Sequence, residues 1–270
     1  MKTLVTGGSG FVGRALVQRL SELDREFCIA TRTTQRYATH KLVAVGDVGA
    51  STDWSDALAG VDTVVHLAAR VHVMRETAPD PLAAFRRVNV AGTENLARQA
   101  AAAGVRRLIF ASTIKVNGEA TIDAPFTEDD TPSPRDAYAI SKWEAEVTLR
   151  SIEAQTGLEV VILRPPLVYG AGVRGNFRRL LDAVARGFPL PLGAVENRRS
   201  LLYLGNFVDA IIACLAHPSA AGRTFLLSDG EAISSPELAA SIARVLGRPA
   251  RLVAVPPGLI RAGATLLGRR

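Results

Sequence analysis

A tyrosine and a lysine stand four positions apart in Tyr138-Ala139-Ile140-Ser141-Lys142, a spacing that places both on one face of a helix. A phenol with a pKa of about 10 is a poor base at neutral pH, and a neighbouring ammonium lowers that pKa. We therefore expect Tyr138 to exchange a proton with a substrate hydroxyl and Lys142 to tune it. The alternative is an exposed helix pair without a chemical role.

Two hydroxyl side chains, Ser112 and Thr113, directly follow the apolar segment Arg107 to Ala111. Residues at the carboxyl ends of parallel strands face the ligand crevice of an open α/β sheet. Either hydroxyl can therefore orient a substrate oxygen. Structural capping by serine and threonine is the competing interpretation.

Three glycines, Gly7, Gly10 and Gly13, lie between a short apolar segment and an amphipathic one. Such a turn lets the backbone approach a pyrophosphate, which then lies at the helix N-terminus. The spacing is GxxGxxG and differs from the common GxGxxG, but its position between a strand and a helix predicts dinucleotide binding. We expect these glycines, with Phe11 and Val12, to contact the cofactor.

The cofactor's adenosine is expected to be read where the second and third strands end. The second runs through Cys28 to Thr34 with Arg32 and without a carboxylate. An acidic residue there suits the ribose of NAD, and a basic one suits the 2′-phosphate of NADP. The pattern favours NADP, although Arg32 could instead stack on adenine or face solvent. Asp47 could accept the adenine amino group or be a solvated turn residue.

Apolar periodicity predicts the elements that must position these residues. The expected strands are 3–6, 27–31, 42–45, 63–67, 107–111 and 159–163, and the expected helices are 11–23, 52–58, 81–103 and 137–155. Strands that alternate with covering helices predict an α/β fold with a Rossmann-type, doubly wound parallel sheet.

After Pro165-Pro166 the pattern loosens into a small C-terminal substrate-binding lobe. Helices are expected at 176–186, 205–216 and 235–246, with short strands at 201–202 and 224–227. We therefore divide the chain into a nucleotide-binding domain, 1–165, and an interleaved lobe, 166–270, whose abrupt end leaves open a longer native C-terminus.

Composition narrows the function classes. The chain has 270 residues, is 48% hydrophobic and carries a net charge of +6. Its arginines are scattered and aromatics make up only 6%, so we expect no nucleic-acid partner and mostly solvated arginines. No membrane-spanning run or signal peptide is apparent, which predicts a cytoplasmic protein. Cys28 and Cys214 are expected to be buried free thiols, and no metal site is expected.

Taken together, these motifs resemble the extended short-chain dehydrogenase/reductase family, in its NAD-dependent epimerase/dehydratase branch. The resemblance extends over nearly the whole chain and is closest to a subgroup labelled UDP-glucose 4-epimerase-like. It rests on these segments: Thr6 to Gly13, Gly46-Asp47-Val48, His66-Leu67-Ala68-Ala69, Asn89 to Thr93, Tyr138 with Lys142, Arg164-Pro165-Pro166, Val168-Tyr169-Gly170, and the stretches 69–74, 115–118 and 175–177.

The resemblance implies further cofactor contacts. Asp47 and Val48 would hold adenine, and Ala68, with Leu67 and Ala69, would line the groove. Asn89 would anchor the active-site helix, Pro165 would neighbour the nicotinamide, and Lys142 could also hold its ribose.

The resemblance also sets the catalytic hydroxyl and the reaction. Counting back from Val116-Asn117-Gly118 makes Thr113 that hydroxyl, preceded by Ser112; Asn117 replaces the usual tyrosine. Dehydratases have an acid and a base at the two positions occupied here by Ile114 and Lys115. Dehydration is therefore not supported.

In the smaller lobe the resemblance places Arg199 on the substrate diphosphate and Asn176 near its phosphates. A solvated pair, Arg198 and Arg199, is the alternative. Many relatives form homodimers through two long helices, here 81–103 and 137–155, and we expect the same.

Three functions remain open. A UDP-glucose 4-epimerase-like enzyme would act at C4 of a UDP-hexose or UDP-N-acetylhexosamine and recycle NAD(P). A 4-keto reductase of a UDP-4-keto-6-deoxy-hexosamine, for surface polysaccharide synthesis, would consume NAD(P)H with the same residues. A non-catalytic NADP(H)-binding sensor is the third, although such relatives typically lack the Tyr/Lys pair.

Overall fold

The computed structural model describes residues 1–33, 41–71, 78–122, 124–256 and 258. Part of the 69–74 stretch and residues 259–270 therefore lie outside the described residues. In chain order the elements are β1 (Thr3–Thr6), α1 (Phe11–Glu22), β2 (Phe27–Thr31), β3 (Lys41–Ala44), α2 (Ser55–Leu58), β4 (Thr63–His66), α3 (Pro81–Arg86), the π-helical turn η1 (Arg87–Ala91), α4 (Gly92–Ala102), β5 (Arg107–Ala111), the 3₁₀ turn η2 (Ile114–Val116), α5 (Ala137–Thr156), β6 (Glu159–Arg164), β7 (Leu167–Tyr169), α6 (Gly175–Ala185), β8 (Arg199–Tyr203), α7 (Leu204–Ala216), the 3₁₀ turn η3 (Pro218–Ala220), β9 (Thr224–Leu226), β10 (Ala232–Ile233) and α8 (Ser235–Val245).

The chain forms two compact units. The first comprises Met1–Pro166 and Leu204–Leu227, and the second comprises Leu167–Tyr203 and Ser228–Arg270. The segment 204–227, which the sequence pattern assigned to the smaller lobe, belongs instead to the first unit. The reason is that β9 pairs with β6 and α7 packs against α1.

The first unit is built on a parallel sheet with strand order β3-β2-β1-β4-β5-β6-β9. In its register Thr3 lies opposite Phe27 on one side and Thr63 on the other. The four residues of β1 and of β4 are all buried, as expected for strands covered on both faces. The predicted doubly wound α/β fold is confirmed.

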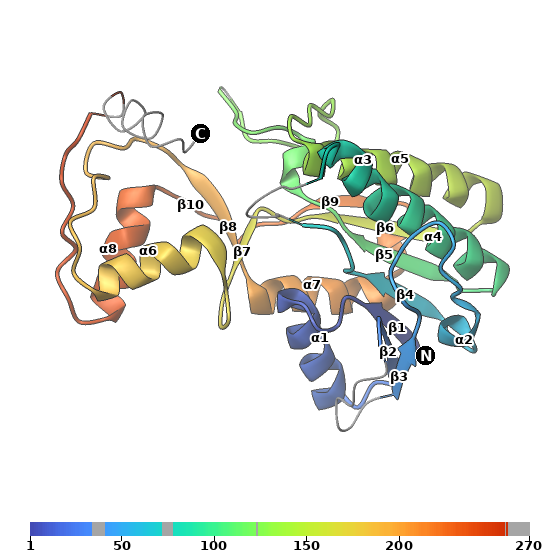
Figure 1. Cartoon of the computed structure of the whole chain (residues 1–270). Helices are drawn as coiled ribbons and strands as arrows, with labels where there is room; N and C mark the ends of the chain where they lie inside the picture. Colours follow the sequence, from blue (N-terminus) through green and yellow to red (C-terminus); the bar gives the residue numbers. More distant parts are fainter. Residues whose placement is uncertain (34–40, 72–77, 123, 257, 259–270) are drawn as a thin grey trace. The chain divides into compact units, whose positions relative to one another are not determined.

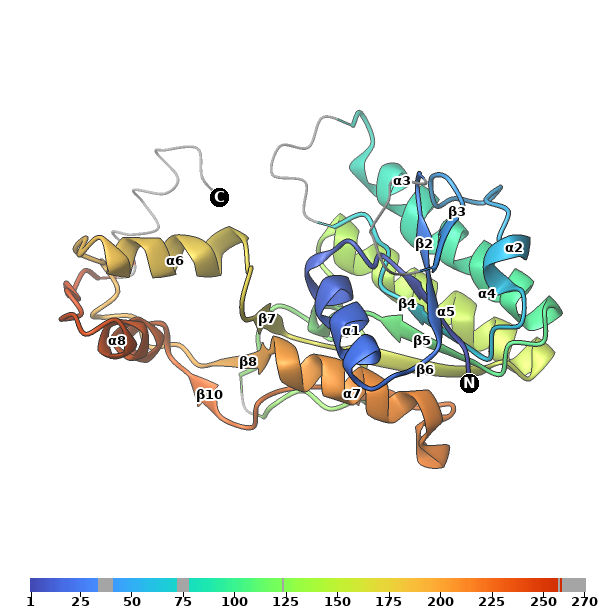
Figure 2. The ribbon, with the colours of Figure 1, turned by 90° about the horizontal axis from the view of Figure 1, so that it is seen from below.

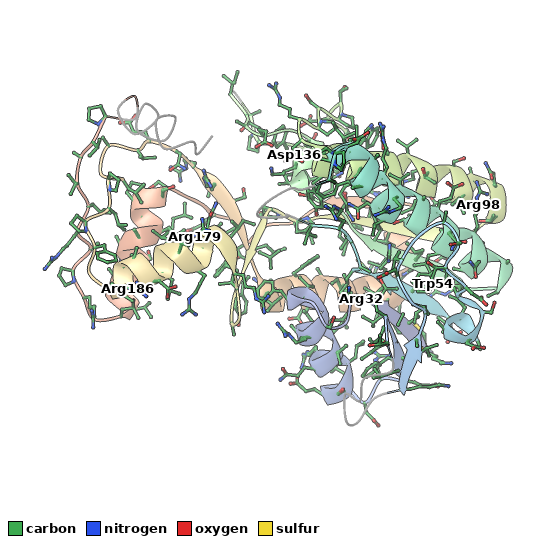
Figure 3. The ribbon with its side chains drawn as sticks, in the orientation of Figure 1. Arg32, Trp54, Arg98, Asp136, Arg179 and Arg186 are labelled. Carbon is green, nitrogen blue, oxygen red and sulfur yellow. The ribbon has the colours of Figure 1, made fainter. Side chains whose placement is uncertain are left out.

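Helices cover both faces of this sheet. In Figures 1 and 2, α1 and α7 lie on one face, and α3, α4 and α5 lie on the other. Leu4 and Phe110 pack in one cluster with Leu96 of α4 and Leu149 of α5. Trp54, which directly precedes α2, is fully buried in the same cluster (Figure 3). The core therefore holds the carboxyl ends of the strands in fixed positions.

The expected helix 81–103 is not uniformly α-helical. Asp80 caps its start by accepting a hydrogen bond from the Ala83 amide, but the pattern changes to a π turn over Arg87–Ala91 before α4 begins. Such turns are frequent at functional sites, and this one carries Asn89. The periodicity of apolar residues does not reveal the change because a π turn of five residues is too short to alter it visibly.

A buried arginine, Arg107, anchors the first residue of β5 to neighbouring elements. Arg107 is 1% exposed, contrary to the expectation of a solvated side chain. Its guanidinium donates to the carbonyl oxygens of Cys214 at 2.6 Å and His217 at 3.0 Å, and pairs with Glu159 at 2.7 Å. Arg107 thus joins β5 and β6 to the C-terminal end of α7.

The second unit contains a small sheet in the order β10-β8-β7, with β7 and β8 parallel and β10 antiparallel to β8. Helices α6 and α8 pack together beside a small core that includes Val184 and Ala239. Ser234 and Glu237 form a capping box at the start of α8. Among the described residues, no helix combines the length and apolar character needed to cross a membrane.

Candidate active site

The turn between β1 and α1 is shaped by glycines that have no room for a side chain. Gly7 has φ +69°, and a Cβ there would lie 2.7 Å from the amide nitrogen of Ala68. A Cβ on Gly13 would lie 2.2 Å from the carbonyl oxygen of Gly7. Gly10 caps α1 without a side-chain hydrogen bond. The first amides of α1 are therefore available to an anion.

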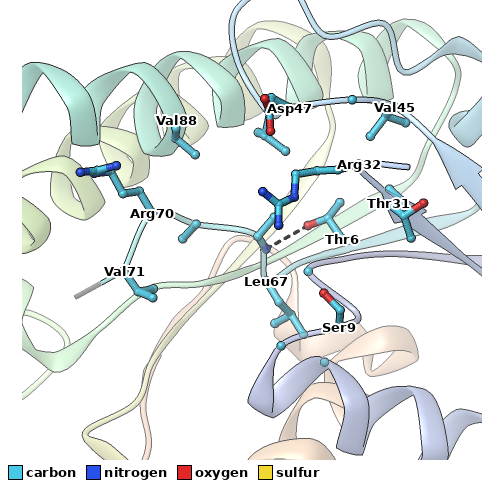
Figure 4. Close-up of a pocket in the computed structure, with 18 of the residues that line it drawn as sticks. Thr6, Ser9, Thr31, Arg32, Val45, Asp47, Leu67, Arg70, Val71 and Val88 are labelled. Atoms are coloured by element: carbon cyan, nitrogen blue, oxygen red, sulfur yellow. Dashed lines mark hydrogen bonds between the residues drawn. The ribbon is translucent and has the colours of Figure 1, made fainter. Parts of the chain in front are cut away.

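This turn forms one wall of a cavity of about 960 Å³ within the first unit. The cavity is lined by residues from the turn and from the ends of β2, β3 and β4 (Figure 4). Eleven of the expected cofactor residues line it: Gly7, Gly10, Phe11, Val12, Gly13, Arg32, Asp47, Val48, Leu67, Ala68 and Ala69. Arg32 and Asp47 both project into it, from the segments that follow β2 and β3.

A buried chain of hydrogen bonds holds the floor of the cavity. Thr6 Oγ1 accepts from the amide of Ala68 at 3.1 Å and bonds to Nδ1 of His66 at 2.7 Å. The other ring nitrogen of His66 bonds to Thr93 Oγ1 at 3.0 Å. Burial, with a further effect of Lys142, lowers the pKa of His66 to about 3. The neutral imidazole thus ties β1 and β4 to α4.

Asn89 links the cavity wall to α5. Its Oδ1 accepts from the Arg70 amide at 2.8 Å, and its Nδ2 donates to the Arg70 carbonyl and to Ser141 Oγ, both at 3.0 Å. Arg70 lines the cavity, and Ser141 lies between Tyr138 and Lys142 on α5. Asn89 is buried and does not itself line the cavity.

Tyr138 and Lys142 lie one turn apart at the start of α5, in environments that disfavour charge. The Lys142 Nζ lies 3.7 Å from the ring centroid of Phe110, and burial lowers its pKa to about 7. The Tyr138 ring packs edge-on against Phe85. Burial, followed by the Asp136 carboxylate, raises the pKa of Tyr138 to about 12. In the chain itself the pKa of Tyr138 is therefore above its ordinary value, because burial of the phenol and the Asp136 charge outweigh any lowering by Lys142.

Ser112 belongs to a buried ionic network. Its hydroxyl donates to the carboxylate of Glu146, which also pairs with Arg164 at 2.6 Å. The Arg164 guanidinium donates to Asn117 Oδ1 at 2.9 Å, and Asn117 Nδ2 donates to the carbonyl of Thr127 at 2.8 Å. The Ser112 hydrogen is therefore engaged by the framework. This network also explains why Asn117, in place of a tyrosine, is fully accommodated in the interior.

Thr113 starts the short turn after β5. Its Oγ1 accepts from the Lys115 amide at 3.3 Å, and the side chain is 9% exposed. The amide of Ile114 donates to the carbonyl of Pro165 at 3.0 Å, so the expected nicotinamide neighbour holds this turn against the end of β6. Pro165 does not line the cavity.

The two expected substrate residues of the smaller lobe both lie in the second unit. Asn176 is exposed in the first turn of α6, and Arg199 is exposed at the start of β8. The neighbouring Arg198 donates to the carbonyl of Ala232 at 3.1 Å.

Several residues of the site escaped the sequence reasoning. Ser9, Thr31, Val45 and Val88 line the cavity, as does Arg70. Their positions beside the glycine turn and at strand ends could have indicated the first three. The contacts of Arg70 with Asn89 depend on the π turn, for which the sequence contains no clear signal.

Comparison with known proteins agrees with this geometry. The sequence model of the NAD dependent epimerase/dehydratase family matches residues 3–227. A UDP-glucose 4-epimerase of Vibrio cholerae is 43% identical over 272 residues, which cover 98% of this chain and 82% of that protein. An N-acetyl-alpha-D-glucosaminyl-diphospho-ditrans,octacis-undecaprenol 4-epimerase of Escherichia coli O157:H7 is 30% identical. The match covers 95% of this chain and 76% of that protein.

The solved structure of MoeE5 in complex with UDP-glucose and NAD superposes with a TM-score of 0.78 at 29% identity, and covers 94% of this chain and 86% of MoeE5. The resemblance inferred from the motifs is confirmed. This chain belongs to the NAD dependent epimerase/dehydratase family.

Proposed function

We propose that the protein is an NAD(P)-dependent enzyme that acts at C4 of a UDP-hexose or UDP-N-acetylhexosamine as a 4-epimerase. The observation that carries the proposal is that one unit holds both a glycine-walled cavity and, outside the residues that line it, Tyr138 and Lys142 on successive turns of α5. The 43% identity to a UDP-glucose 4-epimerase supports the choice of reaction and substrate class.

The cavity residues fit a dinucleotide. Gly7 and Gly13 leave no room for a Cβ, so the backbone can approach a pyrophosphate closely, and the amides at the start of α1 can receive its charge. A volume of about 960 Å³ matches that of cofactor sites. NAD(P) bound here would supply a hydride acceptor and donor for C4.

The residues of the chain would handle the proton. Tyr138 would take the proton from the C4 hydroxyl and return it, while Thr113 would hydrogen-bond the same oxygen. Lys142, with its pKa near neutrality, would favour the phenolate when protonated and would hold the nicotinamide ribose. Asn89 would hold α5 in place through Ser141. The oxidised 4-keto sugar would rotate before the hydride returns to its other face.

For the cofactor we propose a preference for NADP. Arg32 lines the cavity directly after β2, and the segment Cys28 to Thr34 holds no carboxylate to bind the ribose hydroxyls of NAD. The same observation favours a second candidate function. A 4-keto reductase of a UDP-4-keto-6-deoxy-hexosamine would use NADPH once per turnover, whereas an epimerase that recycles its cofactor gains little from that preference.

For the substrate we propose that Arg199 binds the diphosphate and that Asn176 reaches its phosphates. We also propose a homodimer that pairs through α3 to α4 and α5. Val147 on α5 is 49% exposed, which supplies apolar surface for such a contact.

The test incubates the protein with UDP-glucose, UDP-N-acetylglucosamine and a UDP-4-keto-6-deoxy-hexosamine, each with oxidised NAD, with oxidised NADP and, separately, with NADPH. Epimer formation without net cofactor oxidation supports the 4-epimerase. Stoichiometric oxidation of NADPH supports the reductase. Lack of turnover with all three sugars contradicts the proposed function, and a tenfold lower KM for NADH than for NADPH contradicts the NADP preference.

A further inference from the structure

Lys115 bridges the two segments that carry the proposed catalytic hydroxyls. It lies in the 3₁₀ turn after β5, and its amide donates to Thr113 Oγ1 at 3.3 Å. Its side chain extends to the start of α5, where Nζ lies 2.6 Å from Asp136 Oδ2. A second carboxylate, that of Glu119, lies 3.2 Å from the same nitrogen. One residue is therefore bonded to Thr113 and to the helix that carries Tyr138.

Asp136 is an integral part of the start of α5. Its Oδ1 accepts from the Ala139 amide at 2.7 Å, which makes it the N-cap of the helix (Figure 3). An anion at this end is favoured by the helix dipole. The same charge lies two residues before Tyr138, where it opposes formation of a phenolate. The negative charge of Asp136 thus stabilises the start of the helix but disfavours ionisation of the proposed base.

Two charged groups near Tyr138, among the residues that the structure describes, leave this conflict in place. Lys142 follows on the same helix, but it is buried and its pKa is lowered to about 7, so it is only partly protonated at neutral pH. On the α3 side, Tyr138 packs against the uncharged ring of Phe85, and the Arg70 guanidinium lies over that ring.

Two further charges on adjoining helices are already paired with each other. Arg86 at the end of α3 donates to Glu144 of α5 at 2.8 Å. Lys115, which approaches from the turn after β5, supplies a cation in direct contact with Asp136.

We propose that Lys115 is a positioning residue that neutralises the Asp136 carboxylate at the start of α5 and thereby eases loss of the Tyr138 proton. The inference rests on the proposed function insofar as Tyr138 acts as the base. Lys115 occupies a position that would hold an acid or base in a dehydratase. In this chain it would act through Asp136, without contact to substrate.

The expected effect is electrostatic and modest. The side chains of Lys115 and Asp136 are 31% and 38% exposed, so water screens the pair. Removal of the ammonium should raise the Tyr138 pKa by about half a unit, from Coulomb's law in a high-dielectric site. The shift should shrink as salt is raised from about 0.05 to 0.5 M.

The first test is the pH profile of kcat/KM on the preferred UDP-sugar. In Lys115→Gln the ascending limb should move to higher pH by about half a unit, so that activity at each pH on the limb falls about threefold. Lys115→Arg should keep the parent profile. Lys41→Gln, which removes an equal charge from the exposed start of β3, should not move the limb.

A double-mutant cycle tests the route through Asp136. Asp136→Asn keeps an N-cap acceptor but removes the charge, so its limb should move to lower pH. In that background Lys115→Gln should have a smaller effect, because Asp136 no longer holds the ammonium at the start of α5. An equal shift in the presence and absence of the Asp136 charge overturns the proposal, as does an unshifted limb in Lys115→Gln.

A second measurement needs no turnover. The chain labelled with 3-fluorotyrosine, whose phenol titrates at lower pH than that of tyrosine, gives a ¹⁹F resonance for Tyr138 that is absent in Tyr138→Phe. Its pKa should rise in Lys115→Gln and fall in Asp136→Asn. If the parent converts none of the sugars but these shifts occur, the proposed function fails and the inference stands. If the parent is active but its Tyr138 pKa ignores Lys115, the inference fails alone.

Discussion

At the scale of single residues, burial favours the neutral forms of both the candidate base, Tyr138, and its neighbour Lys142. The pKa of Tyr138 rises to about 12 and that of Lys142 falls to about 7. Both directions follow from the cost of a charge in a poorly solvated place. The chain thus holds a neutral phenol beside a lysine that is easily deprotonated. Charged or polar groups of bound ligands would then favour the phenolate form of Tyr138.

Lys142→Met should therefore stabilise the folded chain while abolishing turnover. The lysine pKa is lower in the folded chain than in the unfolded chain, so the unfolded state binds the extra proton between about pH 7 and 10.5. The lysine's cost is largest below that window and disappears above it. We expect a gain on the order of 2 kcal/mol at pH 7 that declines toward pH 10.

Urea unfolding of both chains across this pH range provides the measurement. Lys41→Met, at an exposed position on β3, should change the free energy of unfolding by less than about 0.5 kcal/mol. A Lys142→Met chain that is less stable than the parent at pH 7 would refute the view that the folded chain bears a cost at this position.

Residue types and spacing predict which side chains would carry the chemistry, but they do not predict the pKa values of those side chains. Tyr138 and Lys142 are four apart in sequence, so their shared helix face is a local property. Burial depends on how Phe85 and Phe110 pack over them. The Lys115 contact with Asp136 spans 21 positions, a distance at which only the tertiary structure decides which charges meet.

At the scale of elements, close backbone contacts tightly constrain the β1–α1 turn. Gly13→Ala would put a methyl group where the Gly7 carbonyl oxygen lies 2.2 Å away. Because backbone must shift, we expect a loss of about 2 kcal/mol or more in stability and at least about tenfold weaker dinucleotide binding.

Gly49→Ala is the matched control, since a Cβ there meets nothing within 4 Å. It should leave the stability within about 0.5 kcal/mol and cofactor binding unchanged. Calorimetric titration with NAD and NADP compares the three chains. Equal affinity in Gly13→Ala and the parent would show that the pyrophosphate does not lie at this turn.

The elements themselves were predictable where apolar runs are bounded by glycine or polar residues. The strands 3–6, 27–31 and 107–111 form over the predicted residues. β7 was missed because Leu167–Tyr169 is three residues long and directly follows two prolines. Its pairing partner β8 lies more than 30 positions later, so no local pattern marks it.

At the scale of the whole molecule, part of the arginine excess stabilises the interior. Arg107 and Arg164 are 1% and 3% exposed, although the scattered arginines were expected at the surface. Arg107 fastens α7, which is distant in sequence, to the sheet of the first unit. Arg164 joins β6 to α5 through Glu146. Composition does not predict these buried arginines, because their burial depends on partners that only the tertiary structure brings close.

Arg107→Met should consequently loosen the return segment 204–227. The substitution leaves the carbonyl oxygens of Cys214 and His217 without the guanidinium, and we expect a loss of about 2–3 kcal/mol. Hydrogen exchange should rise first in α7. Arg98→Met, which breaks an exposed pair with Glu94, should cost only about 0.5 kcal/mol. Equal losses in the two variants would contradict the anchoring role.

The proposed chemistry depends on Tyr138 as the proton-transferring group. Its most direct measurement is turnover of the preferred UDP-sugar by Tyr138→Phe, with dinucleotide affinity and thermal stability measured on the same sample. We expect kcat to fall by about 10²- to 10⁴-fold, while affinity and stability stay within error. Turnover equal to that of the parent would contradict the proposed mechanism and favour a protein that only binds the dinucleotide.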